Sequence, residues 1–319
     1  GGPLATGWSF IDPTVFIDDD GRAYLFWGNK GLWYGELNDD MISFKNGYQE
    51  VPGFHDPKCF GPQSMKMNWA KGKEELMVGF EEGPWISKRG DLYYLTYPAG
   101  GVPEHMAYST APTVNGPWTY RGRIMDEAVN SFTIHGGEVT YKGHSYMFYH
   151  NGKLPNGAGF HRSAAVEEFK YNPDGTIPFI PFTENGPAPV GTLNPYERVE
   201  AETMAHSWGL KTDRLPGKNH YGRKIDNGDW IKIREVEFGT EGPKQVTVKT
   251  LNFKNPGTVE FYLNALSDAP FATVKVDGTA DEQTVEVRSR RPVTGKHDVY
   301  ILFRGGDEEL FDFDWWQMK

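Results

Sequence analysis

Residues 15–27 read Val15-Phe-Ile-Asp-Asp-Asp-Gly-Arg-Ala-Tyr-Leu-Phe-Trp27, a strand, a polar turn ending in glycine, and a second strand rich in aromatic residues. The same pattern returns in Trp85–Tyr97 and in Val139–Tyr149. A glycine closes each turn, where a positive φ angle completes a tight hairpin. The turn glycines are Gly21, Gly90 and Gly143. The repeats predict three β-hairpins and an all-β fold.

A third strand follows each hairpin, within 32–37, 105–109 and 159–166. A three-stranded unit that returns every 50–70 residues or so is typical of β-propeller blades. Three blades do not close a ring, and a five-bladed ring needs two more. We therefore predict that residues 1–185 form part of a five-bladed β-propeller.

The pattern changes after this region. Residues 186–195 are rich in Pro, Gly and Asn and are interpreted as a linker. From 196 to 319 short strands alternate between two faces, which predicts an antiparallel β-sandwich of the jelly-roll kind. The clearest of these strands are Gln245–Leu251, Val259–Leu263, Thr284–Arg288 and Asp298–Phe303.

Composition limits the possible ligands. The 319 residues carry a net charge of −10, which would repel the phosphates of a nucleic acid. Aromatic residues make up 14% of the chain, and rings stack well on the C–H faces of neutral sugars.

No apolar stretch reaches the ~18 residues of a membrane-spanning helix, so we expect no membrane association. Cys59 is the only cysteine, so no disulfide forms within the chain.

The sequence opens on Gly1-Gly2-Pro3 without an initiator methionine, and we expect the native N-terminus to lie upstream. No signal peptide is visible. The location of the protein stays open, with a secreted or periplasmic one favoured over the cytoplasm.

Two carboxylates occupy equivalent positions in two of the repeats. Asp12 lies just before the first strand of one repeat, and Glu82 lies just before the first strand of the next. First strands line the channel of a propeller, so the two side chains are expected to converge. A carboxyl group with a raised pKa beside a second carboxylate is suited to protonating a glycosidic oxygen. The alternative is that Asp12 caps a turn before Pro13 and that Glu82 is a solvated charge.

Several linked motifs make residues 1–182 resemble the third to fifth blades of glycoside hydrolase family 43. The resemblance implies a five-bladed, inverting enzyme that acts on arabinose- and xylose-containing plant polysaccharides. The motifs are Ile11–Phe16 with Asp18–Arg22, then Glu82–Lys88 with Tyr93–Tyr97, and finally Ser131–Ser163.

Roles follow from this resemblance by position. Glu82 corresponds to the general acid, and Asp12 to the carboxylate that raises the pKa of the acid and orients it. Arg162 corresponds to a substrate-contacting arginine, and His135 to the axial histidine, often beside a bound cation. The further candidates for substrate contact are Trp85 and Phe16.

The family's general base is an aspartate on the first blade, which this sequence does not contain. Gly2-Pro3-Leu4 resembles the connector that leads into the third blade. We therefore expect an N-terminal segment or a second chain to supply the missing blades, and we expect the 319 residues alone to lack the base.

The C-terminal part resembles carbohydrate-binding module family 6, which implies a structural calcium ion held by Glu200, Glu202 and Asp314. In the sugar cleft, Lys224 replaces the usual tyrosine and Asp312 the usual asparagine, so we expect weak binding there, use of a different face, or a mainly structural role. Trp208 and Tyr221 are the remaining candidates for sugar contact. The motifs are Glu197–Glu202, Ile225–Trp230, Gly295–Phe303 and Leu310–Met318.

Together these features predict an α-L-arabinofuranosidase that trims arabinoxylan or arabino-oligosaccharides. Two alternatives remain. The first is a β-xylosidase that uses the same carboxylates, and the second is a non-catalytic carbohydrate-binding propeller that lacks its base.

Overall fold

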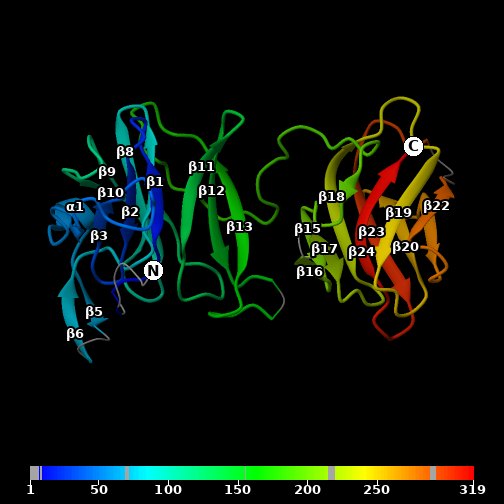
Figure 1. Cartoon of the computed structure of the whole chain (residues 1–319), viewed down its shortest axis with the longest axis horizontal. Helices are drawn as coiled ribbons and strands as arrows, with labels where there is room; N and C mark the ends of the chain where they lie inside the picture. Colours follow the sequence, from blue (N-terminus) through cyan, green and yellow to red (C-terminus); the bar gives the residue numbers. More distant parts are fainter. Residues whose placement is uncertain (1–6, 8, 69–71, 155, 215–219, 288–291) are drawn as a thin grey trace. The chain divides into compact units, whose positions relative to one another are not determined.

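The computed structural model describes residues 7, 9–68, 72–154, 156–214, 220–287 and 292–319. Residues 1–6, which include the expected connector, and Arg288 of a predicted strand lie outside this part. The chain divides into two compact units, Gly1–Pro187 and Ala188–Lys319. Both consist of β-sheets (Figure 1), which confirms the all-β prediction. No helix in the described ranges has the length and apolar character that crossing a membrane requires.

The described part of the first unit contains three antiparallel sheets of three or four strands, and in each the strands follow one another in chain order. Each begins with a hairpin closed by one of the three predicted glycines, all at positive φ, so the predicted hairpins are confirmed. The first sheet comprises β1 (Thr14–Ile17), β2 (Ala23–Trp27), β3 (Trp33–Glu36) and β4 (Gln49–Glu50). The second comprises β7 (Trp85–Arg89), β8 (Leu92–Ala99), β9 (His105–Ala111) and β10 (Thr119–Met125). The third comprises β11 (Gly136–Tyr141), β12 (His144–Asn151) and β13 (Ser163–Phe169).

A short segment separates the first two sheets. It contains the single-turn helix α1 (Pro57–Phe60) and the hairpin of β5 (Ser64–Asn68) and β6 (Lys73–Met77). Asp56 caps the helix, because its side chain accepts a hydrogen bond from the backbone N–H of Lys58 at 2.9 Å.

Aromatic side chains fill the spaces between the sheets of this unit. One core cluster joins the first two sheets through Phe26, Phe80 and Tyr97, and another joins the second and third through Tyr108 and Met147. Full burial of one such apolar side chain contributes about 1.5–3 kcal/mol. Packing between sheets therefore fixes how the starts of their first strands lie relative to one another.

The second unit is the predicted two-sheet sandwich, and its core includes Phe261, Phe303 and Trp316. One sheet has the order β16 (Lys211–Arg214), β17 (His220–Arg223), β24 (Asp312–Met318), β19 (Gln245–Leu251) and β22 (Glu282–Glu286), with β14 (Val199–Glu200) also on β24. The other has the order β15 (His206–Trp208), β18 (Trp230–Glu237), β23 (Lys296–Gly305), β20 (Gly257–Leu263) and β21 (Ala272–Val276).

The stretch interpreted as a linker, 186–195, contains the boundary between the units. Leu193 already pairs with Val236 in a parallel bridge, and its backbone N–H donates to the carbonyl of Glu235 at 2.9 Å. The last residues of this stretch are thus held by the second unit.

Candidate active site

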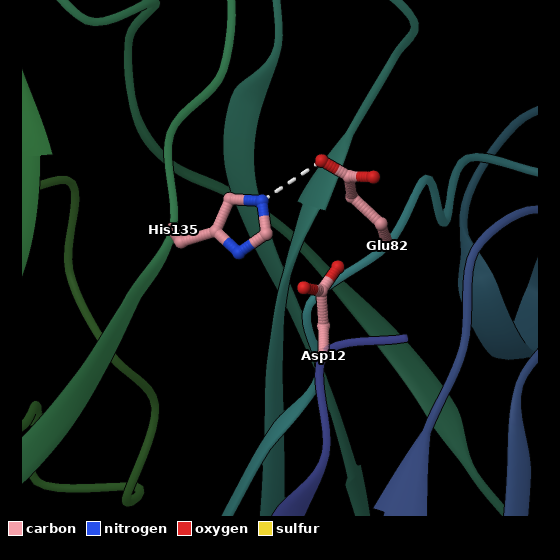
Figure 2. Close-up of side chains that lie close together, drawn as sticks. All are labelled: Asp12, Glu82 and His135. Carbon is pink, nitrogen blue, oxygen red and sulfur yellow. Dashed lines mark hydrogen bonds and ion pairs between the residues drawn. The ribbon is translucent and has the colours of Figure 1, made fainter. Parts of the chain in front are cut away.

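Asp12, Glu82 and His135 meet at one place in the first unit (Figure 2). Each lies just before the first strand of a different sheet: Asp12 before β1, Glu82 before β7 and His135 before β11. Nε2 of His135 is 2.8 Å from Oε1 of Glu82. One ligand atom from each of the three residues lies within 4.8 Å of the other two, and all three residues are half-buried.

The backbone around these residues is shaped for their close approach. Asp12 has a φ of 58°, a left-handed conformation that turns the chain before Pro13. Gly83 also has a positive φ, and a Cβ atom there would lie 2.5 Å from Nδ1 of His135. Only glycine at position 83 therefore leaves room for the imidazole beside Glu82.

Asn29 is a functional candidate that no sequence motif indicated. It follows β2, and its Nδ2 donates a hydrogen bond to Oε2 of Glu82. The adjacent residue, Lys30, forms an ion pair with Glu81, which is buried. Glu81 and Glu82 thus have different partners in the same segment, Lys30 and Asn29. No sequence motif had identified this segment as part of the site.

The pKa values of the two carboxylates shift in opposite directions. Burial raises the pKa of Asp12, and the charge of Glu82 adds to the rise while His135 opposes it. Burial also favours the neutral form of Glu82, but hydrogen bonds from His135 and Asn29 outweigh it, so the pKa of Glu82 lies below its usual range. In the substrate-free site the pKa of Glu82 is therefore lowered, whereas the sequence predicted a raised pKa for the acid.

Arg162 and His150 extend the site along the third sheet. The rings of His135 and His150 stack with centroids 5.6 Å apart. Nη1 of Arg162, an exposed residue, donates to Oγ1 of Thr133 at 2.8 Å. Burial and the charges of Arg162 and His135 lower the pKa of His150 to about 4, so this imidazole is neutral near pH 7. His150 was not among the predicted site residues.

The two predicted aromatic contacts have different surroundings. Trp85 is 40% exposed and lies against Gly137, where a Cβ would be 2.4 Å from the indole. Its Nε1 donates to the backbone oxygen of Glu138 at 3.2 Å, which fixes the ring plane. Phe16 instead is half-buried and packs edge-on against Tyr93 at 5.9 Å, beside the core cluster of the first two sheets.

The predicted calcium ligands do not converge in the described part of the sandwich, where no group of three such side chains meets within 4.8 Å. Both carboxylate oxygens of Glu200 bind Arg198, at 2.8 and 2.9 Å. Oε2 of Glu202 is buried and has no hydrogen-bond partner. Ala201, between them, donates its N–H to the backbone oxygen of Asp314 at 2.9 Å.

The predicted sugar contacts of the sandwich also differ among themselves. Trp208 is 51% exposed on β15, whereas Tyr221 is buried, so Tyr221 cannot offer a ring face to a ligand. Asp312 is buried and accepts a hydrogen bond from Asn252 at 2.7 Å, while Lys224 is exposed with a φ of 52°.

Two adjacent carboxylates, with an exposed indole and an arginine in the same site, are the functional groups that a glycoside hydrolase uses. Comparison with known proteins agrees with this class. Residues 2–177 match Glycosyl hydrolases family 43, and residues 200–319 match Carbohydrate binding module (family 6). The chain belongs to glycosyl hydrolase family 43, and its second unit is a family 6 carbohydrate-binding module.

Two similar proteins are named arabinoxylan arabinofuranohydrolase. The protein from Bacillus subtilis is 29% identical over 97% of this chain, and the one from Paenibacillus polymyxa is 28% identical over 99%. The chain spans 63% and 52% of their respective lengths. A solved structure of the family 43 arabinoxylan arabinofuranohydrolase from Bacillus subtilis, in complex with cellotetraose, superimposes with a TM-score of 0.79 at 26% identity, covering 100% of this chain and 70% of that one.

Proposed function

We propose that this chain carries the proton-donating part of an α-L-arabinofuranosidase that removes arabinofuranosyl groups from arabinoxylan or arabino-oligosaccharides. The observation that carries the proposal is the meeting of Asp12, Glu82 and His135 beside Trp85 and Arg162. The names of the relatives that match both units support the choice of substrate.

In this proposal Glu82 protonates the glycosidic oxygen, and Asp12 tunes and orients it. The hydrogen bond from His135 keeps Glu82 ionised in the free site, so the glycosidic oxygen must replace the imidazole at Oε1. Burial, the largest single influence on the pKa of Glu82, then favours uptake of a proton from solvent by this carboxylate, and the resulting carboxyl group is the acid. Arg162 binds a sugar hydroxyl and the indole of Trp85 supports a sugar face.

We further propose that the three sheets are blades three to five of a five-bladed propeller. Val15 and Ile17 on β1 are 49% and 63% exposed, and Val139 and Phe148 of the third sheet are also exposed. Apolar faces of this kind suit the docking of further sheets. Two such sheets, from the same polypeptide or a second chain, would close the ring and bring the general base that activates water for inversion.

A structural calcium ion in the sandwich is part of the proposal. The unpaired, buried Oε2 of Glu202 fits a hard cation, with Glu200 and Asp314 as further oxygen donors. Glu200 must exchange Arg198 for the ion. A second cation beside His135 would compete with the acid function of Glu82, and we assign that position to proton transfer.

A β-xylosidase is the second candidate, because a relative of that name from Xylanibacter ruminicola is 29% identical over 185 residues, which cover 52% of this chain. Turnover of p-nitrophenyl α-L-arabinofuranoside and β-D-xyloside decides between them. The protein to assay is the ring-complete enzyme, meaning this chain together with the two further sheets proposed above. The anomer of the sugar that is released first tests inversion. Arabinofuranoside turnover at least about tenfold faster in kcat/KM is expected. Turnover of neither substrate, with sugar binding retained, would favour the non-catalytic propeller instead.

A further inference from the structure

Asn29 is only 5% exposed, and its side chain contacts the carboxylate of Glu82. Its Nδ2 donates to Oε2 of Glu82, and the two residues also pair through their backbones in an isolated antiparallel bridge. The contact therefore joins the end of β2 in the first sheet to the segment before β7 in the second.

The backbone on both sides holds Asn29 in place. Gly28 has a φ of 151°, and a Cβ there would lie 1.8 Å from the carbonyl oxygen of Gly31. The N–H of Gly28 donates to the oxygen of Ile11 at 3.0 Å, next to Asp12. On the other side, the N–H of Lys30 donates to the oxygen of Glu81 at 2.8 Å. The segment that carries Asn29 is thus tied to the neighbours of both carboxylates.

The chemistry of the contact distinguishes the two oxygens of Glu82. A carboxylate only accepts hydrogen bonds, so the amide must present its NH2 group to Oε2. Oε1 then remains for the other partner, and His135 Nε2 occupies that position at 2.8 Å. Without a donor on Oε2, the carboxyl group can turn about its last side-chain bond and exchange the two oxygens.

We infer that Asn29 is a positioning residue for the general acid: it holds Oε2 so that Oε1 alone carries the proton toward the glycosidic oxygen. This inference rests on the proposed function of Glu82. It predicts that loss of the amide slows hydrolysis most for substrates whose leaving group must be protonated. The reason is that displacing the acid by ~1 Å lowers the rate of proton transfer by up to about 100-fold.

The test is a series of aryl α-L-arabinofuranosides, from dinitrophenyl through p-nitrophenyl to phenyl, with the ring-complete enzyme. For Asn29→Leu we expect kcat/KM on the phenyl glycoside to fall about 10- to 100-fold, and on the dinitrophenyl glycoside to fall by less than about threefold. Asn29→Gln keeps the donor and should recover part of the loss. Asn38→Leu is the control, since Asn38 donates to Ser43 at 2.9 Å on an exposed turn of the same sheet.

Equal losses for Asn29→Leu on all three substrates, while Glu82→Gln loses selectively on the phenyl glycoside, would overturn the positioning role and leave the acid assignment standing. If Glu82→Gln showed no dependence on the leaving group, the proposed function itself would fail. Should Asn29→Leu not fold, Asn29→Ser provides the same comparison with a smaller side chain.

Discussion

Nε2 of His135 lies 2.8 Å from Oε1 of Glu82, although 53 residues of chain separate them. Each side chain comes from the segment before a first strand, Glu82 in the second sheet and His135 in the third. Correct packing of the two sheets is therefore a condition for the contact. The protonation state of Glu82, the candidate acid, depends on this contact with His135.

The His135→Ala variant should change the pH profile in a defined direction. The hydrogen bond from His135 lowers the pKa of Glu82 against the effect of burial, so its loss raises that pKa. Since the acid must be protonated, activity falls as pH rises through its pKa, and the alkaline limb of kcat/KM should move to higher pH. His144→Ala, which removes an exposed pair with Glu168 at 2.7 Å, is the control. An alkaline limb that stays in place or moves to lower pH would contradict the assignment.

The Gly83→Ala variant should lose activity by displacing His135. The new Cβ would lie 2.5 Å from Nδ1 of the imidazole, and the positive φ adds strain of about 1–2 kcal/mol. We expect kcat/KM to fall by about tenfold or more. Gly90→Ala is a matched control, because Gly90 has a φ of 60° and a methyl group there would have nothing within 4 Å. It should lose stability but not activity, and similar kinetics for both variants would argue against the steric role of Gly83.

The Asp18→Asn variant should weaken the pH dependence of stability in the first unit. Burial raises the pKa of Asp18, but hydrogen bonds from Lys88 at 2.8 Å and Tyr93 at 2.5 Å outweigh it and lower the pKa. A lowered pKa stabilises the fold above the unfolded-state pKa, and the benefit disappears as pH falls through the folded-state value. Asp18→Asn should cost about 1–3 kcal/mol at neutral pH.

Thermal unfolding between about pH 3 and pH 7 checks this prediction. The exposed Asp19, whose carboxylate lies 2.8 Å from the same lysine, offers Asp19→Asn as a control with a small effect. The prediction would be contradicted if the melting temperature of Asp18→Asn fell as steeply with decreasing pH as that of the parent chain.

Calcium should stabilise the second unit. At a concentration of 100 times its Kd, an ion that binds only the folded state adds about 2.7 kcal/mol, so millimolar calcium should raise the melting temperature and a chelator should reverse the rise. Glu202→Gln should abolish this response, whereas Glu197→Gln, at an exposed position, should retain it. A melting temperature that is indifferent to calcium would exclude the ion.

Local patterns were sufficient to predict the sheets. The hairpins around Gly21, Gly90 and Gly143 formed as expected, because a tight turn needs a positive φ and the flanking residues alternate between two faces. The sandwich strand Gln245–Leu251 has the predicted bounds for the same reason. These features depend on neighbours in sequence.

The sequence by itself also placed Asp12 and Glu82 at equivalent positions, before the first strands of successive sheets, and the family resemblance added His135. Only the tertiary structure decided which atoms meet there. Asn29 and His150 joined the site, Phe16 packed against Tyr93, and the pKa of Glu82 is lowered where a rise was expected. The reason is that hydrogen bonds and desolvation act over a few ångströms between residues of different sheets, and strand periodicity carries no information about such contacts.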